Sequence, residues 1–462
     1  MPAVEEVALY EIRKKIYPRA VTGTFMRWRW ALIFATQIIY YGLPWLTWND
    51  RQAVLFDIAA RKFYIFGLVF WPQDVIYLSV LLILAALSLF LFTAIAGRLW
   101  CGYACPQTVY TEVFLWIERK FEGERAARIK LDREGPSVRK FARKGGKHAA
   151  WIALSLWTGI TFVGYFTPIR TLLAAFPAAL GGWEIFWILF YGFATYGNAG
   201  WMREQVCKYM CPYARFQSVM FDRDTLVITY DAGRGEPRGS RSRKADYKAA
   251  GLGHCVDCNI CVQVCPTGID IRKGLQYECI GCAACIDGCN QVMGRMGYPL
   301  GLIRYTTENA LANAYDNATM WKRVFRARTL VYTGLLAGVV LAAGVALYLR
   351  EPLKVDVIRD RGALAREAAP GLIENVYRLQ IMNTSEAPHA FTIAAEGIAG
   401  IAVVGVEQPV PIAGATTRSV AVRLRAPSEV AKPGANRIQF IVQAVDDARI
   451  VRHEASTFLF PR

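Results

Sequence analysis

The stretch that decides the architecture of this chain is a pair of cysteine runs, Cys255-Val-Asp-Cys258-Asn-Ile-Cys261-Val-Gln-Val-Cys265-Pro266 and Cys279-Ile-Gly-Cys282-Ala-Ala-Cys285-Ile-Asp-Gly-Cys289-Asn290. Each run has the spacing C-x2-C-x2-C-x3-C, and thirteen residues separate the two. Three thiolates at such short spacings wrap three corners of a cubane, whereas the fourth cysteine of each run ligates the other cluster. The runs therefore predict two 4Fe-4S clusters in a ferredoxin-like domain at about residues 250–295.

The crossing rule assigns four cysteines to each predicted cluster. The first cluster has the ligands Cys255, Cys258, Cys261 and Cys289. The second has the ligands Cys279, Cys282, Cys285 and Cys265. Zinc is the alternative because C-x2-C is common in zinc sites, but zinc needs four ligands per site and no threefold C-x2-C-x2-C repetition. All eight cysteines instead fall at the spacings of a two-cluster ferredoxin.

The composition of the 462-residue chain indicates a membrane protein with soluble parts. Hydrophobic residues make up 54% and charged residues 20%, which is too apolar for a disordered or collagen-like chain. All 12 cysteines lie between Cys101 and Cys289, which argues against a disulfide scaffold. None of the four histidines lies well inside an apolar run, so a membrane b-haem with two histidine ligands is not expected.

Five apolar runs approach the roughly 20 residues that a helix needs to cross the hydrocarbon core of a bilayer. They cover residues 30–48, 75–96, 149–169, 183–201 and 330–349. The segment 54–71 is also apolar, but Asp57, Arg61 and Lys62 interrupt it, which favours an amphipathic or re-entrant piece over a sixth span. The first run is long enough to stay as an anchor, so no cleavable signal peptide is expected.

The distribution of Lys and Arg predicts the orientation of these spans. Residues 1–29 carry 6, residues 97–148 carry 12 and residues 202–329 carry 18, whereas the two alternate loops carry 3 and 1. Because cytoplasmic segments are enriched in Lys and Arg, those three regions are expected in the cytoplasm, with a four-helix membrane region at 30–201 and residues 350–462 outside. The net charge of +17 is then a membrane-orientation signal, and no nucleic-acid partner is expected.

The C-terminal tail has the pattern of a β domain. Its alternating or β-branched segments are separated by Gly, Pro and Asn, and they cover residues 375–382, 401–406, 419–424 and 437–445. This pattern predicts an all-β sandwich of about 100 residues, the size of an immunoglobulin-like domain. The tail contains no cysteine, so it is not a disulfide-bonded member of that class.

The other four cysteines form two similar segments, Arg98-Leu-Trp-Cys101-Gly-Tyr-Ala-Cys105-Pro106 and Arg203-Glu-Gln-Val-Cys207-Lys-Tyr-Met-Cys211-Pro212. Each segment follows a predicted span, so both are expected at the cytoplasmic edge of the membrane. On a helix, cysteines at i and i+4 share a face and place two soft sulfurs on one metal ion. Proline then ends or bends the helix.

Four interpretations of Cys101, Cys105, Cys207 and Cys211 stay open. The cysteines are buried small hydrophobic residues, or they form a reversible disulfide within each pair. If the two segments converge, they instead hold a third iron-sulfur cluster. The favoured interpretation is a thiolate copper site, because soft sulfur ligands select Cu(I) over hard ions. Thiolates stabilise Cu(I) relative to Cu(II), so an electron from a lower-potential cluster runs downhill to copper.

Taken in order along the chain, these motifs resemble the CcoG family, also called FixG or RdxA. The resemblance covers nearly the whole sequence and implies a multi-pass polyferredoxin of the bacterial inner membrane that assists assembly of cbb(3)-type cytochrome c oxidase. It also implies a Cu(II) reductase that supplies Cu(I), with Cys101, Cys105, Cys207 and Cys211 as the copper or redox thiols. The C-terminal domain is then immunoglobulin-like and periplasmic.

Two other classes of function compete with copper reduction. A respiratory subunit similar to the ferredoxin-type quinol dehydrogenases shares the C-x3-C-P pairs, but such proteins generally stop after the ferredoxin region. A metal-binding assembly scaffold without turnover is the third class. Expected partners are membrane lipid, oxidase assembly factors or a copper chaperone, and a second copy through the small-xxx-small motif Gly334-Leu-Leu-Ala-Gly338. With no G-x-G-x-x-G fingerprint, the sequence does not identify the electron donor.

Overall fold

The computed structural model describes residues 15–360, 365–430 and 433–461, and the chain divides into two compact units. The first unit is Met1–Leu46 with Ser79–Val340, and the second is Thr47–Leu78 with Leu341–Arg462. Part of the predicted basic N-terminus, residues 1–14, lies outside the described residues. So do residues 361–364, 431–432 and 462 of the predicted β tail.

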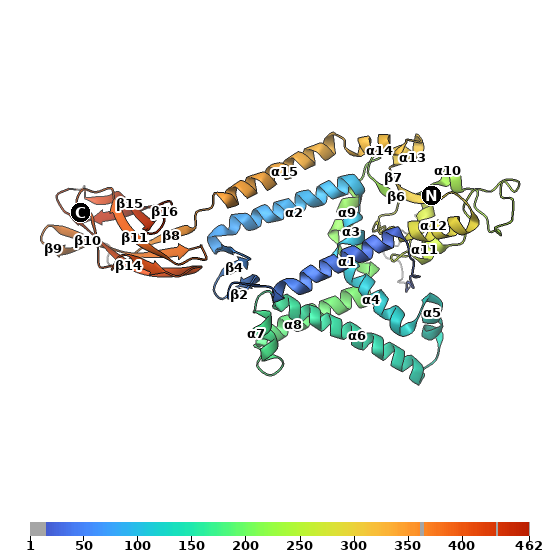
Figure 1. Cartoon of the computed structure of the whole chain (residues 1–462), viewed down its shortest axis with the longest axis horizontal. Coiled ribbons are helices and arrows are strands. Elements are labelled where there is room, and N and C mark those ends of the chain that lie inside the picture. The colour runs from blue at the N-terminus through green and yellow to red at the C-terminus, as the bar shows by residue number, and fades with distance from the viewer. Residues whose placement is uncertain (1–14, 361–364, 431–432, 462) are drawn as a thin grey trace, which may run out of the picture. The chain divides into compact units, whose positions relative to one another are not determined.

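All five predicted apolar runs fold as helices, with shifted limits (Figure 1). They are α1 Thr24–Gly42, α2 Val75–Ala96, α6 Val138–Val163, α8 Gly182–Thr195 and α15 Ala327–Tyr348. Among the described residues, two helices are long and apolar enough to cross a membrane, Pro72–Ala96 and Ala327–Tyr348. Helices α1, α6 and α8 are shorter or more polar than a typical membrane-spanning helix, so the structure does not confirm five spans. Helix α6 starts inside a basic stretch, and α8 has 14 residues before the π-helical segment η3, Tyr196–Met202.

Further helices connect these five. They are α3 Leu99–Tyr103, α4 Pro106–Glu122, α5 Arg125–Arg133, α7 Ile169–Ala175 and α9 Pro212–Val219. Helix α4 begins at Pro106, whose fixed φ suits a first helical turn, and ends at Gly123 with a φ of 88° that glycine adopts without a Cβ clash. Trp151 of α6 stacks on Phe114 of α4 and donates its indole N–H to the Phe114 carbonyl at 3.1 Å. This contact fixes α4 against α6.

The cysteine runs lie in a small ferredoxin-like region with its own core. Strands β6 Val227–Tyr230 and β7 Ile303–Thr306 pair antiparallel, and α11 Ile260–Gln263 and α12 Ala284–Met296 pack beside them. The chain between and after these elements forms η5 Ile271–Lys273, α10 Ala232–Gly235, α13 Glu308–Ala312 and α14 Asn317–Val324. Buried apolar residues from both strands and α12 make the core, namely Ile228, Ile286, Met293, Leu302 and Ile303.

The second unit contains the predicted β-sandwich. One sheet has the order β12-β14-β10-β8, with β9 paired to β10; its strands are β12 Ala402–Val404, β14 Thr416–Pro427, β10 Leu372–Asn383, β8 Leu353–Arg359 and β9 Arg366–Ala369. The other is β13 Val410–Ile412, β11 His389–Glu396, β15 Gly434–Ala444 and β16 Val451–Phe460. Phe391, Phe440 and Phe458 are fully buried in the common core. Each of the four segments predicted from alternation overlaps a strand, which confirms that prediction.

The segment predicted as an amphipathic or re-entrant piece folds as a small antiparallel sheet and adds no span. Its strands are β3 Val54–Asp57, β4 Lys62–Ile65 and β5 Leu68–Phe70, preceded by the hairpin β1 Thr47–Trp48 and β2 Arg51–Gln52. The carboxylate of Glu386 in the sandwich accepts hydrogen bonds from Trp48 at 3.0 Å and from Asn49 and Arg51 at 2.5 Å. The segment is therefore part of the second unit.

Candidate functional site

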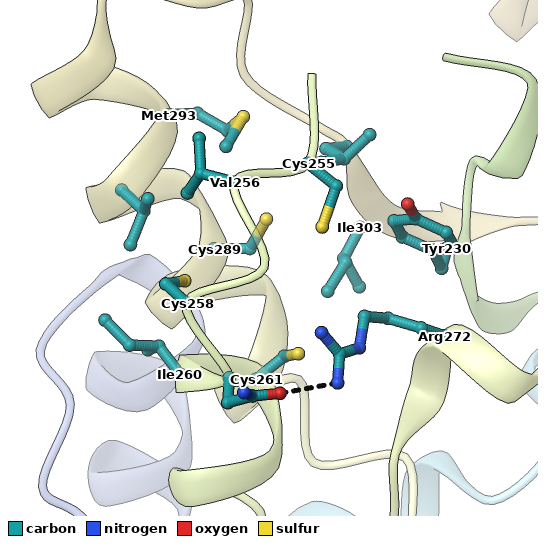
Figure 2. A pocket seen from close by; sticks show the side chains of 13 residues that line it. Tyr230, Cys255, Val256, Cys258, Ile260, Cys261, Arg272, Cys289, Met293 and Ile303 are labelled. Atoms are coloured by element: carbon teal, nitrogen blue, oxygen red, sulfur yellow. Dashed lines mark hydrogen bonds between the residues drawn. The ribbon is translucent and has the colours of Figure 1, made fainter. Parts of the chain in front are cut away.

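The four cysteines predicted for the first cluster line one small, largely apolar cavity. They are Cys255, Cys258, Cys261 and Cys289. Figure 2 shows their sulfur atoms around one space, with the guanidinium of Arg272 and the phenol of Tyr230 beside it. Cys289 reaches this cavity from α12, which belongs to the other cysteine run. The first cavity therefore combines three thiols of one run with the last thiol of the other.

A second cavity is lined by the four remaining cysteines of the ferredoxin-like region. They are Cys265, Cys279, Cys282 and Cys285. Its other walls are mostly apolar, with Ile228, Ile269 and Ile280 among them. Because Cys261 lines both cavities, the two lie side by side. The structure groups the eight thiols in the crossed arrangement that the spacing predicts.

The backbone turns sharply on both sides of the second cysteine in each run. Asp257 and Asn259 have φ values of 48° and 56° in the first run, and Gly281 and Ala283 have 67° and 59° at the matching positions of the second. Non-glycine residues adopt this left-handed region only where the surrounding structure imposes it, because it is strained. The repeated pair of bends wraps each run around its cavity, so that successive thiols face the same space.

The donor sets fit iron-sulfur clusters better than single ions. In the described part of the chain, no three or more His, Cys, Asp or Glu residues are arranged to hold one metal ion. Four thiols spread around an apolar cavity match a cluster of several iron atoms, each bound by one thiolate, and such a cluster supplies one-electron redox chemistry when bound. Burial raises the pKa of Cys279 and of Cys289 to about 12, so both thiols hold their protons until metal displaces them.

The C-x3-C-P cysteines do not share helical faces, and that prediction is wrong. Cys101 lies in α3 and Cys207 in the π-helical segment η4, Val206–Met210. Cys105 and Cys211 instead have extended backbone, with ψ of 127° and 111°, and each precedes the proline that begins the next helix. The ring of a proline clashes with a helical residue before it, so the second cysteine of each pair is forced out of the helix.

The two C-x3-C-P segments nevertheless converge. Burial raises the pKa of Cys207 to about 12, and Cys105, Cys101 and Cys211 add to that rise, whereas Arg98 opposes it. Burial also raises the pKa of Cys101, with a further contribution from Cys105 and Cys211. Cys207 also packs against the buried apolar cluster that contains Cys101, so the two segments meet. We call Cys101, Cys105, Cys207 and Cys211 the C-x3-C-P quartet.

Buried polar side chains from α4 and α9 hold the two segments together. Glu118 of α4 is fully buried and accepts a hydrogen bond at 2.7 Å from Arg203, which begins the second segment. Burial raises the pKa of Glu118, but Arg203 and Arg128 lower it below its ordinary value. Cys101 donates its S–H to Gln217 of α9 at 3.2 Å. Neither Glu118 nor Gln217 belongs to a motif, so the sequence did not single them out.

The quartet lies against the second cavity. Helix α3 packs directly on the loop of the second cysteine run through Gly102. A Cβ atom on Gly102 would lie 2.8 Å from the carbonyl oxygen of Gly281 and 2.9 Å from the amide nitrogen of Cys282. Cys101 and Cys282 belong to one buried apolar cluster. The C-x3-C-P quartet and the second cavity are therefore direct neighbours in the fold.

Replacing Gly102 with Ala is expected to lower the free energy of unfolding by about 1–3 kcal/mol, because the added methyl overlaps backbone atoms that have nowhere to move. Thermal unfolding of the purified holoprotein measures this as a lower Tm. The matched control is Gly294→Ala in α12, where a Cβ meets nothing within 4 Å and should stabilise slightly. Equal Tm values for G102A and G294A would contradict the close contact between α3 and the cysteine loop.

The cavities and the matches to known families together define the class of protein. Residues 202–308 match the family model of a 4Fe-4S dicluster domain, and residues 78–123 match that of a 4Fe-4S binding domain. Residues 343–461 match the model of the IG-like fold at the C-terminus of FixG. The protein is an iron-sulfur electron-transfer protein with an immunoglobulin-like C-terminal domain.

The chain belongs to the FixG/RdxA family. It is 40% identical to Protein RdxA of Cereibacter sphaeroides, over 95% of either chain, and 40% identical to nitrogen fixation protein FixG of Rhizobium meliloti, over 84% of this chain and 80% of that one. Ferredoxin-type protein NapH of Haemophilus influenzae is 22% identical over 45% of this chain and 65% of its own. A crystal structure of a FixG-related protein from Vibrio parahaemolyticus matches 24% of this chain and 97% of its own, at 22% identity and a TM-score of 0.22.

Proposed function

We propose that this protein passes single electrons from two 4Fe-4S clusters to copper and reduces Cu(II) to Cu(I) at the C-x3-C-P quartet. One observation carries the proposal: the quartet converges, and it does so beside the second cavity, where Gly102 meets the loop that bears Cys282. Soft sulfur ligands and a one-electron donor are then neighbours, which is the arrangement that a reductase of a thiophilic metal requires.

The proposed cluster ligands are the eight thiols of the two cavities. Cys255, Cys258, Cys261 and Cys289 hold one cluster. Cys265, Cys279, Cys282 and Cys285 hold the other. Each set surrounds its cavity with four sulfurs and apolar walls, and every iron of a cubane takes one of them. Because Cys261 lines both cavities, clusters held there would be close enough to exchange electrons.

The quartet's part is to bind copper and to favour its lower oxidation state. Each Cu(II) ion that is reduced takes one electron, so two reduced clusters suffice for two ions. Sulfur ligands select Cu(I), which raises the copper potential relative to water. Metal binding releases the thiol protons, because a thiol ligates as the thiolate. Gln217, which accepts the Cys101 S–H at 3.2 Å, holds that side chain in place before metal arrives.

The proposed setting is the bacterial inner membrane. Five spans place the N-terminus and the ferredoxin-like region in the cytoplasm and the immunoglobulin-like domain in the periplasm. Three observations support this: all five apolar runs are helical, two helices are long and apolar enough to cross a membrane, and the Lys and Arg residues gather in alternate loops. Lipid would then cover the exposed apolar side chains of α2 and α15.

The Cu(I) produced is proposed to serve the assembly of cbb(3)-type cytochrome c oxidase, with oxidase assembly factors or a copper chaperone as partners. A second copy of the chain is a further proposed partner. A Cβ added to Gly334 or Gly338 in α15 meets no atom of the described residues within 4 Å, so a second helix can approach there. A monomeric mass in mild detergent would contradict the dimer.

A second candidate function follows from the match of residues 78–123 to a 4Fe-4S binding domain, since that range contains Cys101 and Cys105. In this alternative the quartet holds a third cluster, and the chain relays electrons as a subunit of a quinol dehydrogenase. The similarity to ferredoxin-type protein NapH favours it. Iron analysis separates the two, because two clusters contain about eight iron atoms per chain and three contain about twelve. A scaffold without turnover would transfer no electron.

The test of copper reduction is anaerobic. Dithionite-reduced, desalted holoprotein is mixed with Cu(II), Cu(I) is followed with a chromophoric chelator, and cluster oxidation is followed by absorbance. We expect one Cu(I) for each electron that the clusters lose. Clusters that stay reduced in excess Cu(II), in a sample with at least about eight iron atoms per chain, would contradict the proposal and favour the relay.

A further inference from the structure

Arg98 is a buried cation between the C-x3-C-P quartet and the second cavity. It precedes α3, it is 4% exposed, and its guanidinium donates a hydrogen bond to the carbonyl of Tyr277, two residues before Cys279. Within the described residues, its Nε has no hydrogen-bond partner. No carboxylate of the described chain lies within ion-pair distance of it. A charge removed from water without a partner is costly, so an anion is expected beside it.

The backbone of Arg98 packs on the second cysteine run, because a Cβ added to Gly281 would lie 3.1 Å from the carbonyl carbon and oxygen of Arg98. Burial raises the pKa of Cys101, Cys207 and Cys279, and the charge of Arg98 opposes the rise at all three. Cys101 and Cys207 belong to the quartet, whereas Cys279 lines the second cavity. One guanidinium therefore acts on two proposed redox sites at once.

The first cavity also has an arginine, but its charge is compensated. Arg272 pairs with Asp270 at 2.7 Å and with Asp257 at 2.5 Å. Its third partner is the side-chain oxygen of Asn259 at 2.6 Å. The positive charge beside the first cavity is thus already balanced by two carboxylates. Beside the second cavity, the charge of Arg98 is paired with no carboxylate of the described residues, and its guanidinium donates to a backbone carbonyl.

Two carboxylates on the second cysteine run and beside it do not neutralise Arg98. Asp287 is buried and accepts the backbone N–H of Met26 at 2.8 Å, and Glu278 is partly exposed next to Cys279. Neither forms an ion pair with Arg98. A second arginine in this part of the fold, Arg29, is paired with Glu112 at 3.0 Å. Arg98 is the uncompensated cation among these groups.

We propose that Arg98 is a positioning residue for electron transfer: it is the fixed countercharge of the cluster in the second cavity, raises the reduction potential of that cluster, and holds it beside the quartet. The inference rests on the proposed ligation of a cluster by Cys265, Cys279, Cys282 and Cys285. A cluster bound by four thiolates is anionic and gains one more negative charge on reduction, so a nearby buried cation favours the reduced form. Electrons are thereby retained at the cluster from which copper is reduced.

The test is a redox titration of the full-length holoprotein in detergent, followed by electron paramagnetic resonance, on wild type, Arg98→Gln and Arg98→Lys. We expect R98Q to shift the reduced-to-oxidised ratio of one cluster by about tenfold toward the oxidised form, which is about 59 mV for one electron. R98K keeps the charge and should keep most of the wild-type potential. The matched control Arg272→Gln removes the close ion pairs of Asp257 and Asp270 and should lower the reduction potential of the other cluster.

Gln217→Glu is the second variant, for the case in which R98Q binds iron poorly. It adds a carboxylate of the same size beside Cys101 and leaves Arg98 in place. It should lower the reduction potential of the same cluster as R98Q. Unchanged potentials in R98Q and Q217E at full iron content would overturn the inference, as would an R98K shift as large as that of R98Q. Failure of the proposed function looks different, because wild type itself would then lack iron or leave Cu(II) unreduced.

Discussion

Changing all four cysteines of the C-x3-C-P quartet to Ser is expected to lower the rate of Cu(I) formation by at least about 100-fold, with about eight iron atoms per chain retained. The reason is that the proposed copper ligands and the thiols that line the two cavities are different residues. The quartet offers the soft ligands, while the two cavities use eight other thiols. Hydroxyl oxygens are hard ligands that bind Cu(I) poorly, so the variant loses the site and keeps the electron donor.

The measurement compares wild type and the quadruple variant in the chelator assay at equal iron content. Single variants sharpen it: Cys101→Ser should be more damaging than Met220→Leu, which changes a soft side chain at the end of α9 and leaves the quartet intact. Equal rates in wild type and the quadruple variant would show that copper is reduced elsewhere. A loss of about a third of the iron, from about twelve to about eight atoms, would show that the quartet holds a third cluster.

Replacing Cys289 with Ser is expected to remove the cluster of the first cavity, although Cys289 lies in the second cysteine run. Its thiol lines the first cavity together with three thiols of the first run. Iron should fall by about half, to about four atoms per chain. Copper reduction should persist, because the cavity that remains is the one that packs against the quartet at Gly102.

Cys265→Ser is the matched variant for the other cavity. It should lose the same amount of iron and also lose copper reduction, because the second cavity then lacks its cluster. The pair of variants tests the crossing directly. If the cysteine runs were not crossed, C289S would empty the cavity beside the quartet, and copper reduction would fail in C289S and survive in C265S.

The short spacing of the cysteines explains why the sequence predicted their grouping around two cavities. The cysteines of one run are separated by two or three residues, so their positions around a cavity follow from chain geometry over a few bonds. The left-handed bends at Asp257 and Asn259 recur at Gly281 and Ala283. The apolar runs and the alternating tail were readable for the same reason, because helix and strand periodicity are local properties. The sandwich and the helical state of all five runs followed.

The predicted shared helical face of each C-x3-C-P pair was wrong because proline ends the helix. Cysteines at i and i+4 share a face only if the helix continues, and Pro106 and Pro212 place Cys105 and Cys211 outside it. Apolar composition likewise did not separate a helix from the small sheet at β3, β4 and β5. Short apolar segments are compatible with either structure. The contact that ties the hairpin before this sheet to the sandwich joins Trp48 to Glu386, and these residues are more than 330 positions apart in the chain.

The sequence by itself predicted which thiols line each of the two cavities and that a β-sandwich follows the last apolar helix, because both depend on residues close together in the chain. Only the tertiary structure decided that the two C-x3-C-P segments meet, that they lie against the second cavity, and that Arg98 is buried between them. Arg98 and the Tyr277 carbonyl that it binds are 179 residues apart, and Cys101 and Gln217 are 116 apart. Such pairs share no local pattern, since their contact results from how the helices of the whole unit pack.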